Sequence, residues 1–376
     1  MRFVYALLVA LLPTALFAQQ GPVPAAPGLA AKAYVLFDFY SGQVLVERNL
    51  HARIEPASLT KLMTAYLTFA ALRQKTLRQD QVIPVSPRAS KSEGSRMFIE
   101  PNKPVIVEDL IRGMIVQSGN DACVALAEAI AGDEDVFAQL MTREAQRLGM
   151  KNTNFVNATG LPHPQHYSTA YDLSLLAAAI IRDFPEYYPL YALKEYRYNN
   201  ILQSNRNRLL WIDPTVDGMK TGFTEKAGYC LITSAHRGAR RLISVVLGAA
   251  SESSRATESQ KLLNYGFQFY DTVKLYDKNQ AISSVKVWKG ALNTVRAGFP
   301  YDLYLSVPKG FTHKLKGTVE TQQPLLAPIA EGQNIGVLRV ELDGKPYRDM
   351  PVVALEAVSL AGILGRGWDS IRLLFK

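Results

Sequence analysis

The chain has 376 residues, of which 48% are hydrophobic, and this is enough for about two or three folded units with sizeable cores. Its 42 Lys and Arg exceed its 33 Asp and Glu, which gives a formal net charge of +9. The charge is spread along the chain without any run of about five or six like charges, and this excludes a nucleic-acid-binding arm. A diffuse positive surface fits an anionic membrane or cell wall, and equally an ordinary solvated surface.

The N-terminal residues 1–18 have the pattern of a secretory signal peptide, because Arg2 precedes an apolar run and a cleavage site follows Ala18. The apolar run is short for a membrane span. Residues 19–31 contain three prolines among small residues, which predicts a disordered leader. We therefore expect an exported protein whose folded part begins near Lys32.

Residues 32–272 have the pattern of an α/β unit. A strand, a tight turn and a second strand come first, capped helices follow, and strand patterns return near the end. This order predicts one sheet that is completed by both ends of the segment and covered by helices. The predicted strands are residues 34–39, 43–46, 229–235 and 242–248, and the predicted helices are residues 58–73, 108–117, 120–131, 133–148, 168–182 and 252–270.

The sequence pattern changes after residue 272. Residues 273–353 contain short alternating runs between Gly and Pro turns, and they predict a small all-β domain. Residues 354–376 have helical periodicity with an apolar and a basic face, so we expect an amphipathic helix that lies on a membrane surface without spanning it. Docking of this helix on the β domain is the alternative. The apolar face consists of Leu360, Leu364, Trp368, Ile371 and Phe375.

The Cys and His residues do not indicate a metal site or another cofactor. Cys123 falls on an apolar helix and Cys230 in a strand pattern, so both fit buried free thiols better than a disulfide. The five His residues have no ligand spacing with these cysteines, and we expect them on the surface or in loops.

A Ser and a Lys three residues apart open the first predicted helix. Ser58 and Lys61 would share one helix face, where the amine reaches the hydroxyl. Serine is a weak nucleophile that needs a neighbouring base, and a lysine buried between a sheet and helices loses its proton more easily. Taken alone, the pair has a simpler interpretation as a helix cap and an exposed lysine, because about one or two chance matches are expected in such a chain.

Two further short motifs follow along the chain. The Ser-Gly-Asn motif at residues 118–120 lies between two apolar helices, where its hydroxyl relays protons and its amide holds a substrate carbonyl, or where Asn120 only caps a helix. The Lys-Thr-Gly motif at residues 220–222 precedes a strand pattern and predicts a positive ledge for a carboxylate, with Gly222 leaving room for a ligand. The order of the three motifs is what separates function from chance.

This ordered set resembles the motifs of penicillin-binding proteins and class A β-lactamases. Residues 110–123, 216–222 and 261–267 closely resemble the low-molecular-mass D-alanyl-D-alanine carboxypeptidases, and the resemblance covers nearly the whole chain. It implies a β-lactamase-like fold with an antiparallel sheet and helices, followed by the all-β domain and the terminal helix. It also implies a serine enzyme, inhibited by β-lactams, that removes the last D-alanine of peptidoglycan peptides at the periplasmic face of the inner membrane.

The resemblance implies roles for single positions. Ser58 would be the acylated nucleophile and Lys61 its base, and the backbone N–H groups of Ser58 and Phe223 would form the oxyanion hole. Arg255 occupies the position that faces the terminal carboxylate of the substrate, and Arg206 resembles another arginine at the cleft, with a surface charge as its alternative. Relatives often carry His in place of Phe223, which bears on deacylation or substrate preference. The remaining wall residues are Ser118, Asn120, Lys220, Thr221 and Gly222.

Three alternative functions stand beside the carboxypeptidase. A class A β-lactamase needs a glutamate for fast deacylation, and the only Glu-x-x-x-Asn spacing between the second and third motifs runs from Glu195 to Asn199, far from the second motif. An endopeptidase that cuts peptide cross-links uses the same chemistry on a larger substrate. A non-catalytic wall- or membrane-binding protein is disfavoured because every catalytic position is intact.

Overall fold

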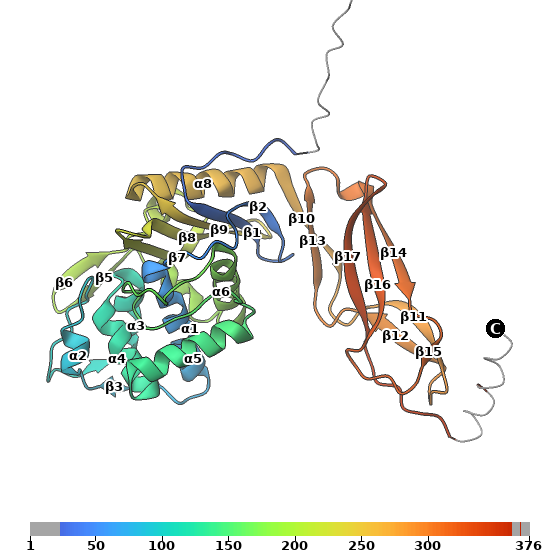
Figure 1. The fold of residues 1–376 in the computed structure, drawn as a ribbon, viewed down its shortest axis with the longest axis horizontal. Coiled ribbons are helices and arrows are strands. Elements are labelled where there is room, and N and C mark those ends of the chain that lie inside the picture. Colours follow the sequence, from blue (N-terminus) through green and yellow to red (C-terminus); the bar gives the residue numbers. More distant parts are fainter. Residues whose placement is uncertain (1–22, 363–368, 370–376) are drawn as a thin grey trace, which may run out of the picture.

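The computed structural model describes residues 23–362 and Asp369 and contains two units (Figure 1). An α/β unit comes first, and a unit made of strands follows the long helix α8 (Glu252–Phe269). The order of elements is the predicted one, with a strand pair, then helices, then strands. The predicted fold class is therefore confirmed for the described part of the chain.

Five antiparallel strands form the sheet of the first unit, in the order β2-β1-β9-β8-β7. The N-terminal strand β1 pairs with β9, roughly 200 residues later, so both ends of the unit complete the sheet as expected. The edge strand β7 contains the Lys-Thr-Gly motif, which lies inside the strand and not ahead of it. The bounds are β1 Ala33–Asp38, β2 Val44–Arg48, β7 Val216–Thr224, β8 Gly228–Arg237 and β9 Arg240–Ala249.

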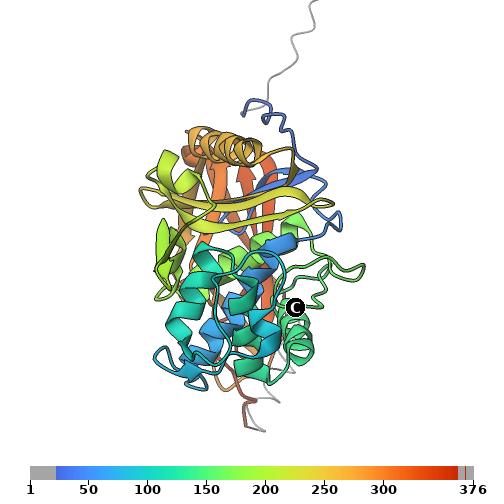
Figure 2. The ribbon, with the colours of Figure 1, turned by 90° about the vertical axis from the view of Figure 1, so that its left-hand side faces the viewer.

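Helices cover both faces of this sheet (Figure 2). On one face α8 packs closely at Gly266, where a Cβ would lie only 2.6 Å from the Leu242 side chain and 2.7 Å from that of Leu36. The larger core lies on the other face. The other helices are α1 Lys61–Arg73, α2 Pro87–Ser90, α3 Val107–Val116, α4 Asn120–Ala131, α5 Glu134–Arg147, α6 Ala170–Asp183 and α7 Leu209–Ile212.

Polar side chains fix where the predicted helices begin. The Asp133 carboxylate accepts hydrogen bonds from two backbone N–H groups at the start of α5. The Thr169 hydroxyl accepts one such bond at the start of α6, and the Ser251 hydroxyl accepts one at the start of α8. The short elements between them are η1 Ala57–Thr60, β3 Val82–Ile83, β4 Val105–Ile106, η2 Tyr188–Ala192, β5 Glu195–Tyr198 and β6 Ile201–Ser204.

The second unit is built from strands, as predicted, and has its own core. A six-stranded sheet has the order β14-β16-β17-β12-β11-β15, and β10 pairs separately with β13. The bounds are β10 Tyr270–Tyr276, β11 Ala281–Trp288, β12 Thr294–Gly298, β13 Leu303–Pro308, η3 Thr312–Lys314, β14 Leu315–Thr321, β15 Leu325–Leu326, β16 Asn334–Leu342 and β17 Lys345–Ala354.

Two expectations for the chain ends differ from the structure. In the expected leader, Leu29 is buried in the core on the α8 side of the sheet, and the Pro24 carbonyl accepts a hydrogen bond from the Tyr265 hydroxyl. The predicted terminal helix does not begin at Ala354, because this residue still belongs to β17 and Val358 is buried in the second core. The rest of that helix, residues 363–376, lies outside the described residues except for Asp369.

Candidate active site

Ser58 and Lys61 lie where the first helix begins. Ser58 belongs to the short turn η1, and α1 starts only at Lys61, so the predicted helix start is early. The Lys61 Nζ lies 3.0 Å from the Ser58 Oγ and 2.5 Å from the carbonyl oxygen of Thr159. Ser58 lines a pocket, whereas Lys61 is only 1% exposed. The contact between hydroxyl and amine that the spacing predicts is therefore present.

Burial changes the protonation of Lys61. Removal of the ammonium from water lowers its pKa to about 8, and the neighbouring carboxylates of Asp121 and Glu134 offset only part of this effect. With that pKa, about a tenth of the molecules carry a neutral amine at pH 7. A neutral amine has a lone pair that can accept the hydroxyl proton, as a serine nucleophile requires.

Ser118 and Asn120 form a second wall at the start of α4. Both residues line the pocket, and the Ser118 Oγ and the Asn120 Oδ1 are buried without a hydrogen-bond partner among the described residues. The Asn120 Nδ2 donates to the Glu93 carbonyl, so the open position of this amide is an acceptor. Because unpaired buried polar atoms are costly, these two atoms are available to form hydrogen bonds with a ligand in the pocket.

The residue after this motif holds the rim of the pocket. Asp121 is fully buried, and its carboxylate accepts hydrogen bonds from the backbone N–H groups of Met97, Phe98 and Ile99. These bonds fix a loop from which residues 94–96 line the pocket. Sequence reasoning missed Asp121, although a carboxylate directly after the motif, at the start of a mostly apolar helix, was the available signal.

The edge strand β7 forms the third wall. Thr221 and Gly222 line the pocket, and a Cβ on Gly222 would lie 3.2 Å from the Pro56 carbonyl, so glycine lets the strand approach the turn that carries the serine. Lys220 lies behind them at 3% exposure, and its Nζ donates to the Thr221 carbonyl. Burial, followed by the charge of Lys61, holds the pKa of Lys220 well below its usual value. Both residues of the predicted positive ledge are buried, with Thr221 lining the pocket and Lys220 behind it.

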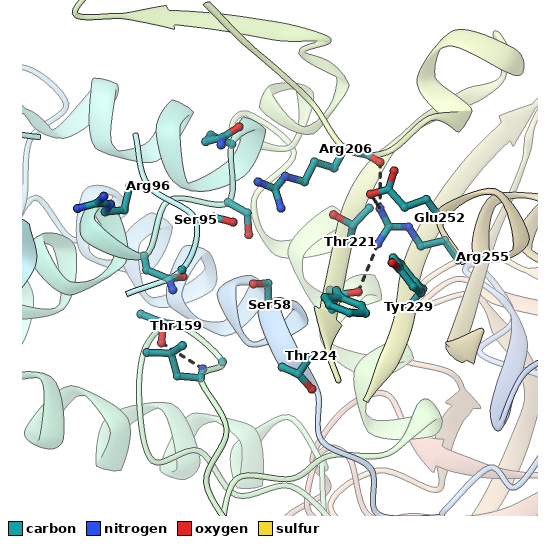
Figure 3. Close-up of a pocket in the computed structure, with 18 of the residues that line it drawn as sticks. Ser58, Ser95, Arg96, Thr159, Arg206, Thr221, Thr224, Tyr229, Glu252 and Arg255 are labelled. Atoms are coloured by element: carbon teal, nitrogen blue, oxygen red, sulfur yellow. Dashed lines mark hydrogen bonds and ion pairs between the residues drawn. The ribbon is translucent and has the colours of Figure 1, made fainter. Parts of the chain in front are cut away.

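Three arginines, Arg96, Arg206 and Arg255, line the pocket, and the two that the sequence predicted differ in their contacts. The Arg206 guanidinium points into the pocket on the side of Ser58 (Figure 3), and no hydrogen bond or ion pair joins its side chain to another described residue. Arg255 in α8 is 3% exposed, and its guanidinium donates to the carbonyls of Gly222 and Arg206 and to the Glu252 carboxylate. Arg255 therefore braces the third wall, and of these two arginines Arg206 is the one with open donors.

Comparison with known proteins identifies the family. Residues 20–251 match the family described as D-alanyl-D-alanine carboxypeptidase, and residues 270–359 match the C-terminal domain of penicillin-binding protein 5. The chain belongs to the D-alanyl-D-alanine carboxypeptidase family. It is a serine peptidase, as the resemblance implied.

Two relatives extend over both units of the carboxypeptidase, and a third covers about two thirds of the chain. D-alanyl-D-alanine carboxypeptidase DacC of Escherichia coli (strain K12) is 41% identical over 371 residues, which are 96% of this chain and 92% of the relative. The crystal structure of penicillin binding protein 5 from Haemophilus influenzae has a TM-score of 0.85 and 41% identity, covering 89% of this chain and 99% of that one. Penicillin-Binding Protein D2 from Listeria monocytogenes, solved in its ampicillin bound form, has a TM-score of 0.59 and 33% identity, covering 64% of this chain and 98% of its own.

The three walls of the carboxypeptidase enclose a pocket of about 540 Å³. Ser58 and Phe223, whose backbone N–H groups are the expected oxyanion donors, both line it. The Phe223 ring is half exposed and lies 4.4 Å, centroid to centroid, from the ring of Tyr229. Phe98 and Leu161 add exposed apolar surface from two other loops, so the mouth of an otherwise polar pocket has an apolar rim.

One histidine and both cysteines of the carboxypeptidase are buried. His166 lies in a loop, as expected, but is buried, and its Nε2 lies 2.7 Å from the Thr60 Oγ1 while its Nδ1 accepts from the Val156 N–H. Burial lowers the pKa of His166 to about 4, so the ring is neutral at pH 7. Cys123 and Cys230 are buried free thiols. Within residues 23–362, no group of three His, Cys, Asp or Glu side chains is placed to hold a metal ion.

Proposed function

We propose that this carboxypeptidase removes the terminal D-alanine of peptidoglycan peptides through an ester on Ser58. The observation that carries the proposal is the Ser58 Oγ, which faces the pocket 3.0 Å from the Nζ of buried Lys61. Neutral Lys61 takes the hydroxyl proton as the Oγ bonds to the carbonyl carbon between the last two D-alanines. The oxygen that becomes negative is stabilised by the backbone N–H groups of Ser58 and Phe223.

Release of D-alanine needs the proton to reach the leaving nitrogen. We assign this transfer to the ammonium of Lys61, with the Ser118 hydroxyl as the relay, because its oxygen is buried in the pocket wall without a partner in the described chain. The Asn120 Oδ1 is then an acceptor for an N–H of the bound peptide. Water attacks the ester, releases the shortened peptide and restores the Ser58 hydroxyl.

A β-lactam would acylate the same hydroxyl, because its ring amide presents a carbonyl carbon to Ser58 while the amine stays attached to the acyl group. The relative from Listeria monocytogenes, solved in its ampicillin bound form, supports this assignment. The reaction with peptides is tested by incubation with pentapeptide muropeptides and mass analysis. Loss of one D-alanine per peptide supports the carboxypeptidase, whereas cleavage of cross-linked dimers alone would assign the enzyme to the endopeptidases.

We assign the terminal carboxylate of the peptide to Arg206, together with the Thr221 hydroxyl. Arg206→Ala is expected to raise KM for the pentapeptide about 10- to 100-fold, since a hydrogen bond between charged groups contributes about 1.5–3 kcal/mol. The value of kcat should change less, because the carboxylate is bound in the ground state and in the transition state alike. Steady-state release of D-alanine measures both constants.

A matched control lies two residues further along the chain. Arg208 is also exposed, donates to the Ser253 hydroxyl and does not line the catalytic pocket. Arg208→Ala should leave KM within about twofold of the unmodified enzyme. If Arg206→Ala behaved like Arg208→Ala while Arg255→Lys lost peptide binding, the carboxylate would belong to Arg255.

We also propose export to the periplasm, with residues 1–18 removed as a signal peptide, residues 32–272 as the catalytic domain and the C-terminal segment on the outer face of the inner membrane. The end of the β domain supports the membrane contact. Leu292, Leu326 and Leu360 are about half exposed there, and the Ala291 N–H donates to the Ser359 carbonyl, which joins two of these segments. The chain continues from this end (Figure 1) into a sequence with an apolar and a basic face.

Among the described residues, no helix has both the length and the apolar character needed to cross a bilayer.

A chain that ends at Gly362 keeps the buried Val358 and should fold, and we expect it to lose most binding to anionic vesicles. Co-sedimentation of this chain and the mature protein measures the difference, and peptide hydrolysis in solution should be equal for both. Equal vesicle binding by the two chains would place any membrane contact elsewhere.

A further inference from the structure

The second partner of the Lys61 amine is a backbone carbonyl. A neutral amine has two N–H donors and one lone pair, and the Thr159 oxygen lies 2.5 Å from the Nζ. When one N–H is directed at Thr159, the lone pair is free to turn toward the Ser58 hydroxyl at 3.0 Å. The position of the Thr159 carbonyl therefore controls whether the lone pair points at the nucleophile.

The residue before this carbonyl, Ala158, is held by hydrogen bonds from two helices. The Ala158 N–H donates to the Glu134 Oε1 at 3.0 Å, and the Ala158 carbonyl accepts from the Thr64 Oγ1 at 2.7 Å. Glu134 at the start of α5 is 6% exposed, and Thr64 on α1 is fully buried. Thr64 and Lys61 share one helix, so the same element that carries the base also anchors the loop that orients it.

Further contacts fix the Glu134 carboxylate and the loop around Ala158. The second oxygen of Glu134 is 2.9 Å from the Arg88 Nη2, which leaves the first oxygen directed at Ala158. Beyond Ala158, the Asn157 Oδ1 accepts from the backbone N–H groups of Thr159 and Gly160. At Gly160 a Cβ would lie 1.9 Å from the Ala57 carbonyl, so the loop touches the turn that carries the nucleophile.

We propose that Glu134 is a positioning residue for acylation, which acts with Thr64 through the backbone of Ala158 and Thr159 to aim the Lys61 Nζ at Ser58. The inference rests on the proposed role of Lys61 as the base. Glu134 touches neither the pocket nor the nucleophile, because it does not line the pocket and its hydrogen bonds go to Ala158 and Arg88. It acts only through the loop and through its charge.

The charge of Glu134 adds a separate and measurable effect. Its carboxylate raises the pKa of Lys61, against the larger lowering effect of burial, so its removal moves this pKa further down. Other ionisable groups around the Lys61 amine come from α4, from β7 and from two loops. These groups are Asp121, Cys123, His166, Arg206 and Lys220.

Two substitutions at Glu134 separate the hydrogen bond from the charge. Glu134→Gln keeps an oxygen acceptor for the Ala158 N–H, so the plateau rate of acylation at high pH should stay within about threefold, while the midpoint of the pH profile moves to lower pH. Glu134→Ala loses both, so the midpoint shifts in the same direction and the plateau falls about 10- to 100-fold. Stopped-flow acylation by a chromogenic cephalosporin, from about pH 6 to about pH 10, gives both quantities.

Asp135→Asn is the matched control. Asp135 neighbours Glu134, lies 3.6 Å from the same Arg88 and is largely exposed, and its carboxylate has no hydrogen bond to the loop. This variant should change neither the plateau nor the midpoint. Rates are normalised to the amount of enzyme that finally carries an adduct, so that partial misfolding does not lower them.

Thr64 tests the other anchor without any change of charge. Thr64→Val should lower the plateau and leave the midpoint in place, and Thr64→Ser should restore the plateau. The proposal is overturned if Glu134→Ala and Thr64→Val acylate at the unmodified rate, or if Glu134→Gln falls as far as Glu134→Ala. Such a result would leave the role of Lys61 intact, because that role is tested separately by substitution of the lysine.

Discussion

Substitution of Ser58 by Ala is expected to abolish the covalent penicillin adduct and to lower peptide hydrolysis by a factor on the order of 10⁴ or more. The reason is that the Ser58 Oγ has a buried amine within hydrogen-bond distance. The other serine oxygen buried in the pocket wall, Ser118 Oγ, has no hydrogen-bond partner among the described residues. Intact-mass measurement after penicillin treatment should show one adduct on the mature enzyme and none on Ser58→Ala.

Ser118→Ala provides the control within the same pocket. It should still acquire a single adduct, more slowly, because it keeps the nucleophile and its base but loses the proposed relay. Peptide mapping of that adduct should place it on the segment that contains Ser58. An adduct that persisted on Ser58→Ala and was absent from Ser118→Ala would identify Ser118 as the nucleophile in place of Ser58.

Replacement of Lys61 by Met is expected to lower the acylation rate about 10²- to 10⁴-fold, the usual contribution of a general base. Methionine fills a similar volume in this fully buried position and has no basic nitrogen. The unmodified enzyme should lose activity in acid, because only the neutral amine accepts a proton. With a pKa of about 8, the rate should rise about tenfold per pH unit below that value and level off above it.

Acylation by a chromogenic β-lactam, followed from about pH 6 to about pH 10, checks the assignment of the base. Lys61→Met should retain only a slow reaction without the rise near pH 8. Circular dichroism and thermal unfolding of the variant show whether the fold is kept. A rate that still rose through pH 8 in Lys61→Met would assign the titration to another group, of which buried Lys220 is the first to test.

Much of the fold follows from patterns that are local in the sequence. The bounds of α4 agree with the prediction, and those of α5, α6 and α8 agree within about two residues, because capping side chains and apolar periodicity both act within a few residues. The all-β unit was predictable for the same reason. The terminal helix was predicted to start too early, because buried Val358 belongs to the β core and no local signal shows where a core ends.

The candidate site was predictable only where side chains carry the chemistry. The motifs point to Ser58 and Lys61, and the structure places these two in contact. The Thr159 carbonyl could not be found, because every residue has a backbone carbonyl and only the fold shows which one meets the lysine. The division of roles between Arg206 and Arg255 depends on which guanidinium finds carbonyl partners, and this too is decided by tertiary contacts.

The pairing of β1 with β9 has a consequence for biogenesis. The hairpins β7–β8 and β8–β9 are local, but β1 must close a loop of roughly 200 residues before the sheet is complete. Pairings of such high contact order form late and make folding slow. A chain emerging at about 5–20 residues per second therefore stays without its complete catalytic sheet until nearly the whole first unit is available. Such a delay leaves the polypeptide unfolded for longer, which suits the export through a translocation pore that we propose.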